Sequence, residues 1–288
     1  MSMLRESDRE ALLKLLADDD ATVLRLLGEQ FTDMGADGRA FLELVAGGTA
    51  AEAKRGARRI LRTMREQEAQ EAFARFCATA GSPSSERGKT ADLEAGCWLL
   101  ARTRYPELDQ PAYEVRLDEL ARELRERLTG RETPRATIEV CNRHLFQTLG
   151  FRGNKQDYYD PDNSYLNRVL DRRLGIPISL GALYLALARR LRLPLHGVNL
   201  PGHFVLAWRS HAARFFVDPF NDGRLLTEAD CREYCEQMGL EFQPQSLAIA
   251  SSRRILLRMC HNLRAIYAAS DEARASQLDR FIALLSQV

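Results

Sequence analysis

The chain has 288 residues, with 41 Lys and Arg against 40 Asp and Glu, so its net charge is close to zero. This balance gives no basis for bulk attraction to nucleic acid or to an acidic membrane surface. No apolar run reaches the ~18 residues of a membrane span, and the N-terminus lacks the apolar core of a signal peptide. We therefore expect a cytoplasmic protein with no nucleic-acid partner and no membrane.

Residues 1–80 are predicted to form a helical region. The stretch LLADDDATVLRLLGEQF at 15–31 is echoed by LVAGGTAAEAKRGARRI at 44–60, an offset of 29 residues. A short turn before an amphipathic helix, repeated in this way, resembles HEAT-type helical repeats, although a plain helical bundle explains two imperfect copies almost as well. Either arrangement is a helical scaffold.

A Gly, Pro and Ser-rich loop at 81–90 follows and is the best candidate for local mobility. Apolar residues at spacings of three and four then predict helices over 92–103, 111–128 and 134–148. Residues 150–175 differ, because Gly, Asn, Asp and Tyr crowd together there with little periodicity before a helix from about Ser164. Its polar residues either cap turns and helices or face a site.

The rest of the chain is organised around residues 175–221. Leucines at helical spacing predict a buried helix, and Pro177 and Ser179 favour its start. Short β-type runs follow, and the last two form a predicted hairpin. A turn centred on Ser210 and His211 would place His203 opposite Asp218. A slip of one residue would send one of these two side chains to the other face.

These residues suggest acyl-transfer chemistry. A helix N-terminus offers unpaired N–H groups that can stabilise an oxyanion, so Ser179 is a candidate nucleophile, with His203 as its base and Asp218 orienting the imidazole. Each also has a structural interpretation. Serine at a helix start is commonly a cap, His203 can be a satisfied histidine at a strand end, and Asp218 can close a turn.

Six cysteines are scattered among apolar neighbours without a CxxC pair, which favours reduced structural thiols. Cys231, Cys235, Cys260 and His261 form the one set that resembles metal ligands, but their spacing fits no standard zinc site. We therefore expect no metal and no cofactor.

The runs YYDPDNSYLNRVLDRRLGIPISLGALYLALARRLRLPLHGVNLPGHFVLAW and FFVDPFNDGRLL resemble the SirB-type branch of the transglutaminase-like superfamily. The resemblance runs from about Asp92 to Thr227. It implies a papain-like transglutaminase core within 90–240, in which a helix bearing the nucleophile packs on an antiparallel sheet. His203 and Asp218 match the positions of the superfamily's His and Asp.

The superfamily's enzymes have Cys at the start of that helix, whereas this chain has no cysteine between Asn142 and Asp230. Ser179 is the nearest hydroxyl, two residues from the strict register. Because serine needs far more base assistance than a thiolate, cysteine-type protease or transglutaminase activity is not expected. The C-terminal segment, 245–288, resembles a tetratricopeptide-type helical hairpin.

The expected fold is therefore α+β and predominantly helical, with a HEAT-like N-terminal region, a small antiparallel sheet and a C-terminal helical hairpin. Three functions stay open: a regulatory module whose cleft binds a peptide or protein; a serine-dependent hydrolase or acyl transferase on amide or ester bonds; and, least favoured, a regulator acting on nucleic acid. In the second, Asp160, Asn163, Asn167 and Asn221 would line the cleft. The sequence does not specify the oligomeric state.

Overall fold

The computed structural model of this chain describes residues 6–79 and 89–287. It contains two compact units, one formed by Met1–Ala72 with Arg102–Glu107 and the other by Phe73–Ala101 with Leu108–Val288. The predicted loop at 81–90 lies outside the described residues up to position 88. The segments predicted as a core, 90–240, and as a C-terminal hairpin, 245–288, fall in the second unit, apart from the short piece at 102–107.

The first unit is helical, as predicted. It contains α1 (Glu6–Leu16), α2 (Ala21–Asp33), α3 (Gly35–Gly47) and the first part of α4 (Ala51–Thr79). The side chain of Asp20 caps α2 by accepting a hydrogen bond of 2.6 Å from the backbone N–H of Thr22. Each of the two echoed stretches covers the end of one helix, a turn and the start of the next helix, so the sequence repeat coincides with a helix–turn–helix repeat.

The second unit holds the remaining helices. These are α5 (Lys89–Arg104, up to Ala101), α6 (Gln110–Arg127), α7 (Pro134–Asn142), α8 (Leu166–Arg172), α9 (Pro177–Leu191), α10 (Glu228–Gln237), α11 (Ser252–Tyr267) and α12 (Glu272–Ser286). The helix predicted over 134–148 is α7 continued by a π-helix, η1 (Arg143–Thr148). Three short 3-10 helices complete the set within the described part of this unit: η2 (Pro161–Asn163), η3 (Pro219–Asn221) and η4 (Pro244–Leu247).

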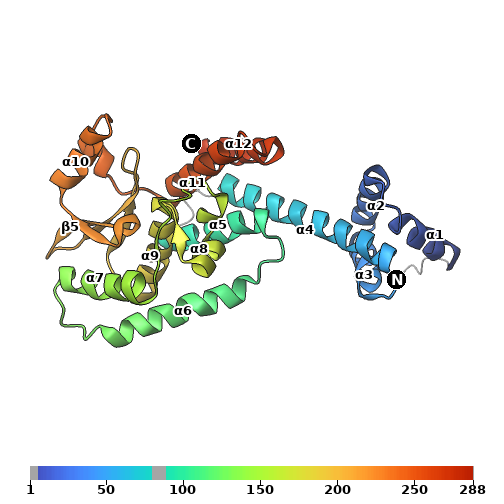
Figure 1. The fold of residues 1–288 in the computed structure, drawn as a ribbon, viewed down its shortest axis with the longest axis horizontal. Coiled ribbons are helices and arrows are strands. Elements are labelled where there is room, and N and C mark those ends of the chain that lie inside the picture. Colours follow the sequence, from blue (N-terminus) through green and yellow to red (C-terminus); the bar gives the residue numbers. More distant parts are fainter. Residues whose placement is uncertain (1–5, 80–88, 288) are drawn as a thin grey trace. The chain divides into compact units, whose positions relative to one another are not determined.

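Two small sheets accompany these helices. β1 (Arg152–Gly153) pairs in parallel with β2 (Leu174–Gly175). The antiparallel sheet has the order β3-β4-β5-β6, formed by Leu195–Val198, Val205–Arg209, Arg214–Asp218 and Arg224–Leu226. The buried helix α9 packs against β3 and β4 on one side and against α6 and α8 on others (Figure 1). The α+β, predominantly helical fold is confirmed.

The side chain of Phe204 packs between the antiparallel sheet and α9. Its ring is fully buried and lies against two glycines, Gly181 in α9 and Gly197 in β3. A Cβ atom at Gly181 would lie 2.4 Å from this ring, and one at Gly197 would lie 2.7 Å from it. The absence of side chains at both positions lets the ring enter, and the buried ring fixes the place of the preceding residue, His203.

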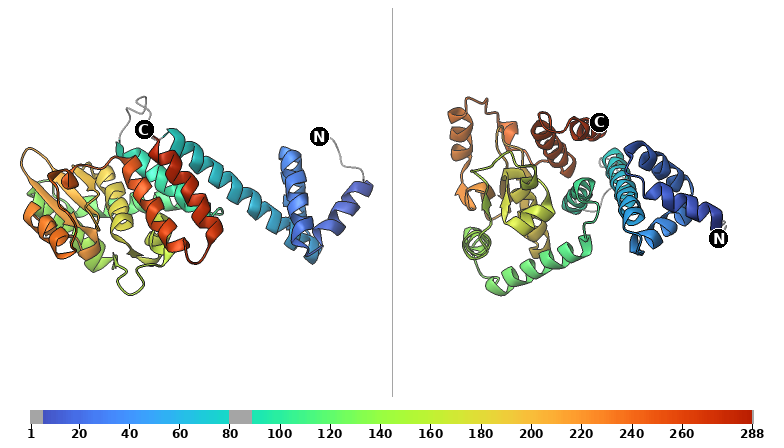
Figure 2. Two further views of the ribbon diagram at one scale, coloured as in Figure 1. Left: turned by 90° about the horizontal axis from the view of Figure 1, so that it is seen from above. Right: turned by 45° about the vertical axis from the view of Figure 1, so that its right-hand side comes forward.

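The C-terminal segment forms the predicted helical hairpin. Helices α11 and α12 lie side by side (Figure 2), and Phe281 of α12 contacts Phe73 edge-on with ring centroids 4.8 Å apart. Ser251 and Asp271 cap the two helices through hydrogen bonds from Arg254 and Arg274 N–H. No helix among the described residues has the length and apolar character needed to cross a membrane.

Candidate functional site

A tight turn presents His203 at the start of β4. Pro201 and Gly202 occupy the middle of this turn, and the N–H of His203 donates to the carbonyl of Leu200 at 3.0 Å. Gly202 has φ +69°, which fits the second central position of a type II turn, where glycine is preferred. The Pro-Gly dipeptide therefore orients the residue that carries the imidazole.

His203 and Asp218 form a buried hydrogen-bonded pair. The Nε2 atom of His203 lies 2.8 Å from Oδ2 of Asp218, and the two residues are 5% and 4% exposed. With Nε2 engaged, Nδ1 is the ring nitrogen left for a ligand or a reacting group, since no hydrogen bond joins it to any part of the chain that the structure describes.

The pair forms although the predicted hairpin register was wrong. Trp208 pairs with Phe215, which centres the turn one residue later than expected and shifts the strand pairing by two residues. A shift of two keeps each side chain on its own face of the sheet, because side chains alternate with a period of two. His203 therefore reaches Asp218 diagonally rather than directly across.

The carboxylate of Asp218 is held on several sides. Its Oδ1 accepts hydrogen bonds from the N–H groups of Phe220 and Asn221 at 3.0 and 3.3 Å, and its Oδ2 accepts one of 2.8 Å from the Asn221 side chain. Burial acts to raise the pKa of Asp218, but the hydrogen bonds from His203 and Asn221 outweigh it and hold this pKa below its usual value. Asn221, predicted to line a cleft, thus positions Asp218.

Aromatic rings surround the imidazole. The Tyr234 ring of α10 lies 5.0 Å from that of His203, and the Phe220 ring lies 6.2 Å from it, edge-on. Tyr158 in turn contacts Phe220 at 5.9 Å and Tyr159 at 5.3 Å. Tyr159 is 74% exposed, so this aromatic rim extends from the buried pair into solvent.

A cavity of about 160 Å³ opens beside the pair, between His203, Asp218 and helix α10. Its charged lining comprises three carboxylates, Asp218, Asp230 and Glu233, and the guanidinium of Arg224. Sequence reasoning missed the contribution of α10 to this site. The signal was Tyr234 three residues after Cys231, which places both side chains on one helix face.

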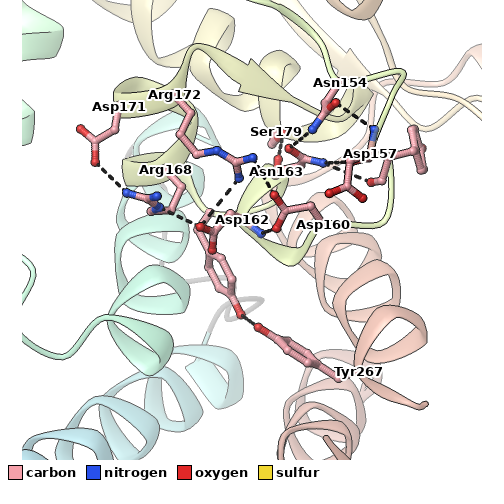
Figure 3. Close-up of polar contacts among 12 residues, drawn as sticks. Asn154, Asp157, Asp160, Asp162, Asn163, Arg168, Asp171, Arg172, Ser179 and Tyr267 are labelled. Carbon is pink, nitrogen blue, oxygen red and sulfur yellow. Dashed lines mark hydrogen bonds and ion pairs between the residues drawn. The ribbon is translucent and has the colours of Figure 1, made fainter. Parts of the chain in front are cut away.

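Ser179 points away from this chemistry. It is 1% exposed, and its hydroxyl donates to the carbonyl of Asn163 at 2.5 Å and accepts from the N–H of Ile176 at 3.0 Å (Figure 3). No hydrogen bond joins Ser179 to His203 among the residues that the structure describes. The hydroxyl therefore closes the first turn of α9 and ties it to the polar segment before α8.

Asn163 and Asp160 belong to the polar network drawn in Figure 3. The Asn163 side chain accepts from Asn154 at 3.0 Å and donates to the carbonyl of Asp157 at 2.7 Å. Asp160 caps η2 and forms an ion pair of 2.6 Å with Arg172. Both side chains thus hold the loop between β1 and α8.

Asn167, the fourth predicted cleft residue, is buried in α8. Within the described ranges its Oδ1 has no hydrogen-bond partner, and the same is true of the nearby hydroxyl of Ser164. The structure does not join either residue to the His203–Asp218 pair by a hydrogen bond.

All six cysteines are buried, free thiols. Cys231 lines the cavity beside His203, but burial, helped by the carboxylates of Asp230 and Asp218, raises the pKa of its thiol to about 12. A thiol with that pKa carries almost no thiolate at neutral pH and is a poor nucleophile. Residues 6–79 and 89–287 contain no grouping of three or more His, Cys, Asp or Glu side chains that could hold a metal ion.

The sequence is similar to a known domain family and to several known proteins. Residues 111–261 match the domain family described as the transglutaminase-like superfamily. A UPF0162 protein of Xylella fastidiosa (strain Temecula1) is 38% identical over 206 residues, covering 68% of this chain and 73% of that protein. A UPF0162 protein of Pseudomonas aeruginosa is 35% identical over 191 residues, covering 65% and 68%.

Human F-box only protein 21 is 37% identical over 134 residues, which cover 44% of this chain and 21% of that protein. No solved structure matches the chain.

Proposed function

Because the chain belongs to the transglutaminase-like superfamily, we propose that it is a regulatory or protein-interaction module of the SirB-type branch, which binds a peptide or protein segment in the cleft around His203 and Asp218. The observation that carries this proposal is the position of the Ser179 hydroxyl. It is bound to backbone groups of residues 163 and 176, so the His–Asp pair has no nucleophile hydrogen-bonded to it among the described residues.

Several features favour binding. The aromatic rim of Tyr158, Tyr159 and Tyr234 offers large rings beside a polar anchor, and aromatic residues are enriched at binding hot spots. The Nδ1 atom of His203 is available to bond a ligand N–H or O–H group. The cavity of about 160 Å³ is smaller than the pockets of about 300–1,000 Å³ that enclose small molecules, so it suits one side chain of an extended segment better.

The F-box relative supports a modular role. The segment that it shares makes up 44% of this chain but 21% of that longer protein. A segment that occurs in chains of such different length is consistent with a binding module that works alongside other parts.

A serine-dependent hydrolase or acyl transferase is the alternative function. It is favoured by the formed His203–Asp218 pair and by the position of Ser179 in the first turn of α9. It requires Ser179 to give up three buried hydrogen bonds before it can act. A nucleic-acid regulator is less favoured, since the net charge is +1.

Selection of binding peptides from a random display library against the full chain tests the proposal. We expect Tyr159→Ala to weaken the recovered peptides about 10-fold or more, as for a hot-spot aromatic. The matched control Leu44→Ala removes an apolar side chain that is 64% exposed, in the first unit, and should leave affinity unchanged.

Hydrolysis of p-nitrophenyl acetate and of a blocked glutamine amide is measured in parallel. Turnover that Ser179→Ala abolishes in a folded protein would support the enzyme instead.

A further inference from the structure

Arg258 lies against the turn that presents His203. It comes from α11, and its Nη1 donates to the carbonyl oxygen of Leu200 at 2.8 Å. The same oxygen accepts the N–H of His203 at 3.0 Å. One carbonyl therefore joins the guanidinium to the residue that carries the imidazole, although the two are more than 50 positions apart in the sequence.

This guanidinium has no counter-ion among the described residues. Other arginines of the same unit are paired, for example Arg168 with Asp162 and Arg172 with Asp160. Arg258 is half-buried, and burial lowers its pKa, with the phenol groups of Tyr158 and Tyr234 opposing that effect. A cation withdrawn from water without an anion carries a desolvation cost, which an incoming anion would offset.

The turn that Arg258 contacts lies beside the cleft, because Leu200, whose carbonyl accepts from Arg258, lines the same cavity as His203 and Asp218. Aromatic rings lie on the same turn and around the imidazole. The Tyr234 ring lies tilted beside the His203 ring, and its hydroxyl donates to the carbonyl of Gly202 at 3.4 Å. Tyr158 contacts Phe220, which is itself edge-on to His203.

We propose that Arg258 forms a subsite for a carboxylate of the ligand bound beside His203. Nη1 already serves Leu200, which leaves the Nε and Nη2 edge of the guanidinium without a partner in the described chain. That edge is a two-donor fork whose geometry matches a carboxylate. Where the ligand is a peptide, this inference rests on the proposed function and adds that the peptide carries Asp, Glu or a free C-terminus.

The side of His203 that faces α10 does not suit an anion. Its cavity is lined by Asp218, Asp230 and Glu233 against Arg224 alone. Lys155 lies over the Phe220 ring, with its Nζ 5.8 Å from the ring centroid, so the aromatic rim carries a second positive charge. Charge complementarity therefore directs a ligand carboxylate toward Arg258.

The test titrates the full chain with acetyl-glutamate amide and follows the arginine Nε–Hε signals by NMR. The uncharged acetyl-glutamine amide is the matched ligand, and acetyl-glycine supplies a free C-terminal carboxylate instead. We expect the Arg258 signal to shift saturably with a carboxylate probe and Arg258→Gln to weaken that binding about 10-fold or more. Whichever carboxylate probe binds more tightly identifies the source of the carboxylate.

Two variants keep the test sharp. Arg254→Gln removes the same charge one turn earlier on α11, at an exposed position, and should bind as the wild type does. Arg258→Lys keeps the charge but not the fork, and should be intermediate and folded.

Equal binding of the glutamate and glutamine probes, unchanged binding by Arg258→Gln, or tighter binding of inorganic phosphate would overturn the subsite. The proposed function fails separately. If the glutamate probe binds at Arg258 while the display library yields no peptide, the peptide-binding role is lost and the subsite stands. If peptides bind without preference for a carboxylate, the subsite is lost and the role stands.

Discussion

The hydroxyl of Ser179 stabilises the first turn of α9 and is not positioned as a nucleophile. While 1% exposed, it accepts the N–H of Ile176 and shares its proton between the carbonyls of Asn163 and Ile176, so its removal takes one hydrogen-bond partner from each of these buried groups. We expect Ser179→Ala to lower the free energy of unfolding by about 1–3 kcal/mol. Urea denaturation measures this. Ser270→Ala, at an exposed helix end, should change it by about 0.5 kcal/mol or less.

Asp218 gives the site a pH dependence whose sign follows from its pKa. The folded-state pKa is lowered relative to an ordinary aspartate, so the stabilisation is present above the unfolded pKa of about 3.9 and is lost as pH falls through the folded value. Asp218→Asn should therefore cost about 3 kcal/mol of unfolding free energy at neutral pH. This cost should shrink below about pH 4, where the wild-type carboxyl is also neutral.

Urea titrations of both proteins between acid and neutral pH check this prediction. Asp279→Asn, which breaks the exposed ion pair with Arg264, is the control and should cost less than about 1 kcal/mol at every pH. A cost for Asp218→Asn that stayed constant down to the lowest pH would contradict the linkage.

At the scale of elements, the contact between α9 and the sheet depends on glycines. In Gly181→Ala the new methyl group would meet the Phe204 ring at 2.4 Å, so the helix and the sheet must move apart. We expect a loss of about 1–3 kcal/mol of unfolding free energy from this overpacking. Phe204→Leu in the same chain should restore part of it.

The helix α2 supplies the comparison. A Cβ atom at Gly28 meets Ile60 at 3.6 Å, an ordinary contact, so Gly28→Ala should stabilise the chain by up to about 1 kcal/mol through helix propensity. Thermal and urea unfolding of both variants measure the difference. The interpretation of Gly181 fails if Gly181→Ala and Gly28→Ala change the free energy of unfolding in the same direction.

The local sequence pattern was sufficient to predict the helices and strands around the site and the His203–Asp218 pair. Leucine spacing predicts α9, and the alternation of the following runs brings His203 to the face of Asp218 even with a turn misplaced by one residue. The roles of Tyr234 and Arg258 were not predictable in this way. They reach the cleft from α10 and α11, and no local rule states which distant helix packs against a given turn. For Ser179 the local pattern predicted the position but not the role, because a cap and a nucleophile differ only in the direction of the hydroxyl.

At the scale of the whole molecule, the chain has two compact units, and the first has its own apolar core. That core gathers residues of α1 to α4 such as Leu16, Phe31 and Leu42, all from the first 64 positions. The His203–Asp218 pair, its aromatic rim and Arg258 all lie in the second unit. Because a unit with its own core can unfold as a unit, calorimetry of the full chain should show two transitions.

Deletion of residues 1–72 tests the separation directly. We expect the shortened chain to lose one calorimetric transition and to keep the other within a few degrees, since the deletion removes the first core and leaves every residue of the cleft. Peptides selected on the full chain should bind it with unchanged affinity. As a control, Ile60→Ala in the full chain should lower only the first transition, through the cavity it leaves in the first core. A single transition affected by both changes would mean that the two units unfold together, and loss of peptide binding on deletion would place part of the binding surface in the helical region.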